Sequence, residues 1–447
     1  MRATSESVPE VTMASKKVHR GKRNALPKDP RIDEIVNNYL AKLYAPLKDR
    51  DRVPGVAVAV RWNKQIVHLN CYGYANLETG AKITPNTVFD LGSLSKQFTA
   101  AAIYNLVIQN QLDLNDPLSK FFPELPPWAE AITVEDLLHH TSALPEYVAI
   151  YEKLRGHRAK GWYNKALKKP DDWYPGMPNR KKNEFTNKDV LYWLGSRKRL
   201  SAPDAEYHYS NSGYVVLAEL VERVAQQPFT EYVMETVISG IDDVMKKTYV
   251  FDEVNRFSPD DPETHYHAKC YNRVRDRFVP VGYTPLNFIV GDGNVHSTIS
   301  DLAVWETFHH KLDYNLPARE LLWSPVLIKN HKKVDYGAGW QLAREKYEDQ
   351  VKVNGKLVTR KHEYRAEHHR GEWLAWRSFI GRASKWVVPE GGKSIDARRA
   401  ESLGIIVLSN ADFGDKQFTT CRIAQEISKL YLGKWKKDNI MSKFNCD

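Results

Sequence analysis

The sequence predicts an α/β sandwich, an antiparallel sheet with helices on both faces, and a mainly helical lobe inserted into it. Apolar strand patterns occur near both ends of the chain, at residues 55–60 and 403–409. Between them, residues 111–200 show short helical and loop patterns interrupted by proline. We therefore expect the two ends of the chain to build the sheet and the middle to build the helical lobe.

Each predicted element has its own pattern. Apolar residues recur at helical spacing from 32 to 43, which indicates an amphipathic opening helix. Residues 55–60 and 65–70 are apolar runs joined by a short polar connection, the signature of a β-hairpin. After the late strand, residues 416–432 carry apolar side chains on one helical face. The resulting units are a disordered basic tail (1–29), an α/β lobe (30–110 and 280–433), a helical lobe (111–279) with a basic insertion (152–199), and a C-terminal tail (434–447).

The composition is that of a globular protein. Of 447 residues, 42% are hydrophobic, 27% charged and 11% aromatic, which excludes wholesale disorder and collagen-like or coiled-coil architectures. No apolar stretch is long enough to span a membrane, and no secretory signal is readable, so we expect a cytoplasmic protein, with an organellar leader as the alternative. The four cysteines are widely separated and form no CxxC pair, so we expect reduced thiols.

The positive charge is local. The formal net charge is +10, yet residues 152–199 hold 14 Lys or Arg against 5 Asp or Glu, and residues 1–29 hold 7 against 3. A nucleic-acid-binding domain would spread basic residues over a face, so no nucleic acid partner is expected. The basic insertion is either a lid that guides anionic or aromatic substrates or a solvated surface loop.

Ser93 and Lys96 form the first pattern that suggests chemistry. They stand three residues apart at the start of a run of helix formers, so their side chains should share one helical face. A buried lysine has a lowered pKa and can take the proton of a serine hydroxyl, which is otherwise a weak nucleophile. Alone, the spacing is more typical of a serine cap beside an exposed lysine.

Two later motifs supply further polar groups. Tyr209 and Asn211 lie in EYHYSNSGY, where a phenol could relay a proton as a partial phenolate and an amide could orient a substrate carbonyl. His369 and Gly371 lie in HHRGEWLAWRS at an expected strand edge, where the glycine should let substrate approach the backbone. The backbone N–H of Glu372 is then a candidate oxyanion donor.

With these motifs the sequence resembles the serine β-lactamase and penicillin-binding-protein superfamily, in particular its class C-like branch of esterases and D-amino-acid peptidases. The resemblance extends to LLHHTSALPEY (137–147), GDGNVHSTISDLA (291–303) and YGAGW (336–340). It implies an acyl-enzyme serine hydrolase with a β-lactamase/transpeptidase-like fold. It implies Ser93 as the nucleophile, Lys96 as its base partner and Tyr209 as the proton relay. The implied substrate-binding positions are Asn211, His369 and Gly371.

The sequence also departs from the family pattern. Ala143 and Ala375 replace glycines, and His369 replaces the usual lysine, which removes a permanent cation. With an ordinary pKa near 6.5, His369 would be a switchable cation toward an anionic substrate. The change favours small esters or amides, with D-peptidase or β-lactamase activity as the alternative and a non-catalytic binding or scaffold homologue as an alternative of another class.

Cofactor and metal sites are not expected. The paired histidines, such as His139 and His140, are sequence neighbours and do not face one another on a helix, and HExxH and GxGxxG motifs are absent. Trp373 and Trp376 either line a substrate pocket or belong to the core. The expected partner is therefore a small ester, amide or peptide, including anionic ones.

Overall fold

The computed structural model describes ten stretches of the chain and Cys446. These are residues 26–48, 50–148, 186–241, 245–251, 267–282, 285–312, 322–353, 356–388, 398–414 and 419–433. Residues 1–25 of the basic tail and 152–185 of the basic insertion lie outside them, so most of the segment named in the lid hypothesis is not described.

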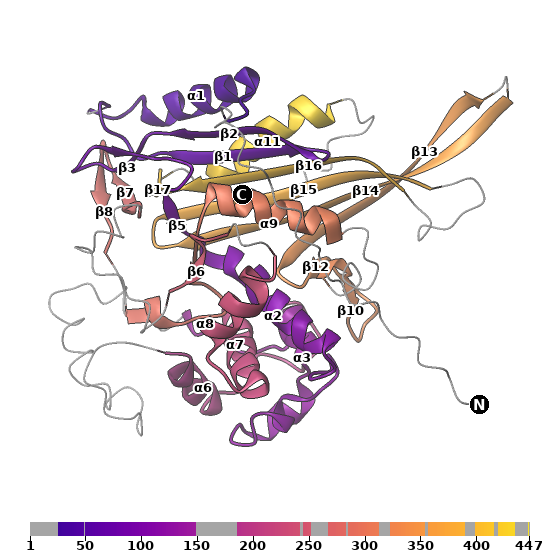
Figure 1. Cartoon of the computed structure of the whole chain (residues 1–447). Helices are drawn as coiled ribbons and strands as arrows, with labels where there is room; N and C mark the ends of the chain where they lie inside the picture. Colours follow the sequence, from indigo (N-terminus) through magenta and orange to yellow (C-terminus); the bar gives the residue numbers. More distant parts are fainter. Residues whose placement is uncertain are drawn as a thin grey trace.

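A seven-stranded antiparallel sheet is the centre of the fold (Figure 1). Its order is β12-β13-β14-β15-β16-β1-β2, so the first strand of the chain pairs with a late one, and Val58 lies opposite Val407. The predicted hairpin is confirmed as β1 and β2, and the late strand as β16. The bounds are β12 (Tyr336–Gly337), β13 (Trp340–Val353), β14 (Lys356–Trp373), β15 (Trp376–Val388), β16 (Arg398–Ser409), β1 (Val56–Trp62) and β2 (Gln65–Tyr72).

Helices cover both faces of this sheet, as the sequence predicts. One face carries α1 (Pro30–Tyr44) and α11 (Thr419–Leu432). The other face carries α9 (Ile299–Leu312), and the helical lobe lies beyond it (Figure 1). Side chains of a strand alternate between the two faces of a sheet, and β1 is buried on both. Val58 belongs to the hydrophobic core under α1 and α11, and Ala59 to the core under α9.

The helical lobe is built around α7 (Asn211–Ala225), against which α2 (Lys96–Ile108) packs. The sequence assigned the residues of α2 to the α/β lobe, and α2 contacts that lobe as well: Phe98 stacks on Trp305 of α9 with ring centres 4.0 Å apart. The other helices are α3 (Val134–Leu138), α6 (Asn187–Gly195), α8 (Phe229–Tyr232), η1 (Gly92–Ser95), η2 (Leu118–Lys120), η3 (Pro127–Ala131), the π-helical η5 (Val233–Ile238) and η7 (Pro285–Phe288).

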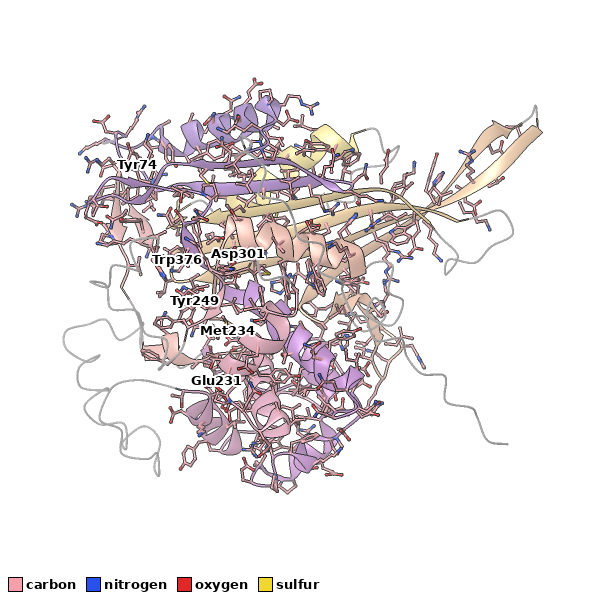
Figure 2. All side chains as sticks on the ribbon, viewed as in Figure 1. Tyr74, Glu231, Met234, Tyr249, Asp301 and Trp376 are labelled. Atoms are coloured by element: carbon pink, nitrogen blue, oxygen red, sulfur yellow. A yellow bond between two sulfur atoms is a disulfide. The ribbon has the colours of Figure 1, made fainter. Side chains whose placement is uncertain are left out.

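A three-stranded sheet lies apart from the central one. In it, β5 (Val88–Asp90) pairs with β9 (Val295–Thr298), which pairs with β6 (Tyr249–Val250). Asp301, labelled in Figure 2 at the start of α9, accepts hydrogen bonds from Lys247 N (2.9 Å) and Thr248 Oγ1 (2.8 Å). The remaining strands are β3 (Tyr74–Asn76), β4 (Ala81–Lys82), β7 (Tyr271–Val274), β8 (Arg277–Pro280), β10 (Val326–Leu327), β11 (Lys333–Val334) and β17 (Ala411–Asp412).

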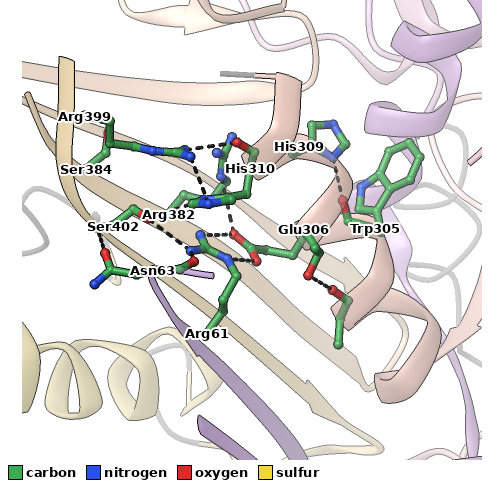
Figure 3. A network of polar contacts seen from close by, with 12 residues as sticks. Arg61, Asn63, Trp305, Glu306, His309, His310, Arg382, Ser384, Arg399 and Ser402 are labelled. Atoms are coloured by element: carbon green, nitrogen blue, oxygen red, sulfur yellow. Dashed lines mark hydrogen bonds and ion pairs between the residues drawn. The ribbon is translucent and has the colours of Figure 1, made fainter. Parts of the chain in front are cut away.

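A buried ionic network fixes α9 to the sheet (Figure 3). Arg61 of β1 contacts Glu306 of α9 through two bonds of 2.5 and 2.6 Å, and Arg382 of β15 lies 3.5 Å from the same carboxylate. Burial raises the pKa of Glu306, but the two guanidiniums outweigh this and hold it below its usual value. Removing one partner of such a pair leaves a buried charge uncompensated, at a cost of about 3–5 kcal/mol.

Two of the four cysteines form a disulfide, which corrects the expectation of reduced thiols. Cys421 of α11 is bonded to Cys446, whereas Cys71 and Cys270 are free. The two cysteines are 25 residues apart in sequence, so their pairing depends on the tertiary structure and could not be predicted from spacing. Disulfides are rare in the cytosol, so this bond does not support the expected cytoplasmic location. Within the described stretches, no helix has the length and apolar character needed to cross a membrane.

We predict two free thiols in the denatured, unreduced protein and four after reduction, measured with a thiol reagent. The Cys446→Ser variant should lose about 2–4 kcal/mol of unfolding free energy, because the cross-link restricts the unfolded chain. Denaturant titration measures this loss. Four reactive thiols without reductant would contradict the pairing.

Candidate active site

Ser93 lies in a tight turn that the sequence placed at a helix start. It belongs to the 3₁₀ turn η1, and Lys96 is the first residue of α2. In a 3₁₀ turn, positions three apart eclipse one another, so the two side chains meet. Gly92 supplies the positive φ of 52° that begins the turn, and Asp90 Oδ1 accepts its N–H at 2.8 Å.

Lys96 is fully buried and makes three hydrogen bonds. Its Nζ lies 3.0 Å from Ser93 Oγ, 2.7 Å from Asn211 Oδ1 and 2.9 Å from the backbone oxygen of Asp292. The last two are carbonyl oxygens, which only accept hydrogen bonds. A neutral amine would donate its two N–H groups to them and keep its lone pair toward the hydroxyl of Ser93.

Burial also sets the proton affinity of Lys96. Desolvation lowers the pKa of Lys96 to about 8, even though the carboxylates of Asp292 and Glu146 favour its charged form. A substantial fraction of the amine is therefore neutral near pH 8.

Tyr209 completes the group, although not as the phenolate that the sequence suggested. Lys96 Nζ lies 5.1 Å from its ring centre, and the Ser93 hydroxyl acts to lower the pKa of the phenol. Although 37% of the Tyr209 surface is exposed, desolvation outweighs this effect and raises the pKa of Tyr209 above its ordinary value. The phenol is therefore neutral and carries a proton.

The first turn of α7 positions Asn211. Ser210 caps this helix, its Oγ accepting the N–H of Gly213 at 3.1 Å. Asn211 N donates to Glu146 Oε2 at 2.7 Å, while Asn211 Oδ1 accepts from Lys96. The amide oxygen is thus directed at the lysine.

Two acidic residues near Lys96 were missed as site residues. Glu146 contacts the backbone of Asn211, and Asp292 Oδ2 accepts from the phenol of Tyr147 at 2.9 Å. Burial raises the pKa of both carboxyls. Both lie in motifs that carry the family resemblance, LPEY and GDGN, but spacing alone gives no sign that they converge on a lysine.

The third motif lies on the part of β14 that faces η1. Pairing of β13 with β14 ends at Gln341 opposite His368, so the following residues of β14 lie beyond that ladder, as the expected strand edge requires. A Cβ on Gly92 would lie 2.8 Å from Glu372 N, which brings this N–H to the turn that holds Ser93. The side chain of Glu372 points elsewhere and pairs with Arg377 at 3.0 Å.

His369 is a buried neutral imidazole, so the expected charge switch near pH 6.5 is wrong. The carbonyl of Arg370 accepts from His369 Nδ1 at 2.7 Å, which leaves Nε2 to accept the phenol of Tyr336 at 2.9 Å. Burial, reinforced by the charge of Lys96, lowers the pKa of His369 to about 3. His369 therefore does not supply the positive charge of the lysine that is usual at this position.

Gly371 also has a packing role. A Cβ there would lie 1.9 Å from the carbonyl oxygen of Leu91 and 2.0 Å from Ser378 Oγ. The space that a side chain would need at this position is filled by the protein. It lets β14 approach the turn that holds Ser93.

Ala143 and Trp376 complete the comparison with the sequence. Ala143 adopts a positive φ of 55°, the conformation for which the family uses glycine at this turn.

Trp376, labelled in Figure 2, packs edge-on against Phe89 with ring centres 6.0 Å apart, which fits a core role.

Comparisons with known proteins identify similar sequences. Residues 40–427 match the family model described as Beta-lactamase. A penicillin-binding protein of Bacillus subtilis (strain 168) is 26% identical over 315 residues, 68% of this chain and 63% of that protein. Protein flp of Staphylococcus aureus (strain NCTC 8325 / PS 47) is 25% identical over 207 residues, 45% of this chain and 35% of that protein. The chain thus spans less than two thirds of the length of these curated relatives.

Solved structures share the fold. The octameric penicillin-binding protein homologue from Pyrococcus abyssi superposes with a TM-score of 0.63 at 22% identity, over 91% of this chain and 77% of that chain. The D-amino acid amidase from Ochrobactrum anthropi SV3, complexed with L-phenylalanine amide, gives 0.60 at 19% identity, over 89% and 95%.

The burial of His369 generates a prediction. The ring should stay neutral between pH 8 and about pH 4, since its pKa is lowered to about 3. Nitrogen chemical shifts of labelled histidine, assigned by comparison with His369→Gln, measure its protonation. Protonation of His369 near pH 6.5 would contradict its placement.

Proposed function

The chain belongs to the beta-lactamase family, and from this premise we propose that it is a serine hydrolase that cleaves small carboxylic esters or amides through an acyl-enzyme on Ser93. One observation carries the proposal: the fully buried Nζ of Lys96 has two obligate acceptors and lies 3.0 Å from Ser93 Oγ. The only one of its three bonds that can reverse direction is the one to the hydroxyl.

In the acylation step, the neutral amine of Lys96 takes the Ser93 proton as Oγ attacks the substrate carbonyl carbon. The C–O π electrons move to the carbonyl oxygen, and the N–H groups of Ser93 and Glu372 stabilise the oxyanion. When the carbonyl re-forms, the bond to the leaving group breaks and that group receives a proton from the phenol of Tyr209, which Lys96 re-protonates. The alcohol or amine departs and an ester on Ser93 remains.

Water then releases the acid. It loses a proton to the same Lys96–Tyr209 pair as it attacks the ester carbonyl, and Ser93 Oγ recovers a proton when the C–O bond breaks. Asn211, held by Lys96 and Glu146, would orient the acyl side of the substrate.

The charges around the site do not select between an anionic and an uncharged substrate. His369 is neutral and the carboxyls of Glu146 and Asp292 lie near Lys96, which disfavours an anion, whereas the charge of Arg370 acts on Tyr209 and His369 and favours one. Penicillin-like carboxylates therefore stay an alternative substrate class. Amides remain a second candidate substrate class because the fold is shared with the D-amino acid amidase.

We predict a covalent adduct on Ser93 when a fluorophosphonate or a slow ester is supplied, located by mass spectrometry of peptides. Ser93→Ala should abolish labelling and most ester turnover, because the nucleophile is lost. Ser95→Ala is a matched control: this serine is buried two positions away and its Oγ accepts from Val295 N. Undiminished turnover in Ser93→Ala would refute the mechanism.

A second prediction concerns pH. Because Lys96 must be neutral to accept a proton and its pKa is about 8, kcat/KM should fall about tenfold per unit below pH 8. Asp292→Asn removes a carboxylate that favours the charged amine, so the fall should begin at a lower pH. Rates with a neutral ester between pH 5 and 9 test this. A profile that Asp292→Asn leaves in place would contradict the assignment.

A further inference from the structure

His140 is a buried residue outside the proposed catalytic group, and its backbone is held in an unfavourable conformation. It follows α3 in the LLHHTSALPEY turn, is 0% exposed and has a φ of 61°. A non-glycine residue rarely adopts this region, and such outliers cluster at functional sites. The turn therefore holds His140 in place against a local preference.

This turn supports the segment that ends in Tyr209. The backbone oxygens of His140, Thr141 and Ala143 accept from the N–H groups of residues 208, 204 and 200, at 2.9 Å in each case. His140 adds a bond from its side chain, because Nδ1 accepts the N–H of Ser210 at 3.1 Å. The residues on either side of Tyr209 are thus bonded to His140, one to its backbone and one to its ring.

The ring of His140 also packs directly on the phenol. Its centre lies 4.3 Å from that of Tyr209 and 4.5 Å from that of Tyr336. Since Nδ1 accepts a backbone N–H, the single proton of the neutral ring is on Nε2, which is buried and has no hydrogen-bond partner among the described residues. Burial and the charge of Lys96 lower the pKa of His140, so the ring keeps its accepting nitrogen at neutral pH.

We propose that His140 is a positioning residue for Tyr209: through Ser210 and through ring contact it holds the phenol beside Ser93 and Lys96. The inference rests on the proposed function, because the role assigned to Tyr209 is proton transfer. It adds a residue that touches neither the substrate nor the reacting atoms. Its loss should therefore slow the chemistry and leave substrate binding almost intact.

Three variants test the role of the side chain. His140→Leu keeps apolar bulk and removes the acceptor, so kcat for a neutral ester should fall at least tenfold while KM changes less than about threefold. His140→Asn places an amide oxygen near the position of Nδ1 and tolerates a positive φ, so it should recover most of kcat. His140→Gly relaxes the backbone and removes the acceptor, so it should lose kcat even if His140→Leu fails to fold.

A double variant shows whether His140 acts through Tyr209. In a Tyr209→Phe background, His140→Gly should cost less than about twofold, because the phenol that it positions is already absent. The matched control is His139→Leu: this neighbour is also buried, but its Nδ1 bonds to the Glu135 carbonyl at 3.0 Å and not to the Tyr209 segment. It should lose thermal stability and keep kcat.

The outcomes separate this proposal from the proposed function. No adduct and no turnover in the wild type would refute the hydrolase assignment. If the wild type is active, any of three results would overturn the positioning role. The first is an unchanged kcat in folded His140→Gly, and the second is equal impairment of folded His140→Asn and His140→Gly. The third is a fully additive loss in the double variant. Rescue by asparagine together with non-additivity supports it.

Discussion

The burial of one lysine is the constraint on which the site depends. An amine with no solvent exposure must find its acceptors inside the protein, and Lys96 finds them on three separate segments, at Ser93, Asn211 and Asp292. These segments belong to the turn before α2, the first turn of α7 and the loop before β9. Satisfying a single side chain therefore requires the helical lobe and the small β5-β9-β6 sheet to be assembled together.

The sheet also lies in close contact with the turn that holds Ser93. Glycines allow it: Gly371 leaves room for the Leu91 carbonyl, and Gly92 leaves room for the backbone of Glu372. The buried pair of Arg61 and Glu306 holds α9 against the same sheet.

Family membership and the individual chemistry of this chain are different matters. The chain has the serine, lysine and tyrosine of the beta-lactamase family pattern, yet its third motif holds a neutral histidine bonded to Tyr336. Replacing a permanent cation by a buried neutral ring changes the charge that a substrate would meet. The histidine instead becomes part of the aromatic group, with His140 and Tyr336, that surrounds Tyr209.

Short-range patterns were enough to predict the opening helix, the β1-β2 hairpin, the late strand and the pairing of Ser93 with Lys96, because each depends on residues close in sequence. The convergence of Glu146 and Asp292 on Lys96, the Cys421–Cys446 bond and the neutrality of His369 could not be predicted in this way. They arise when segments far apart in the chain meet and exclude water. Contact and desolvation set the pKa values of these groups, and both are properties of the packed fold.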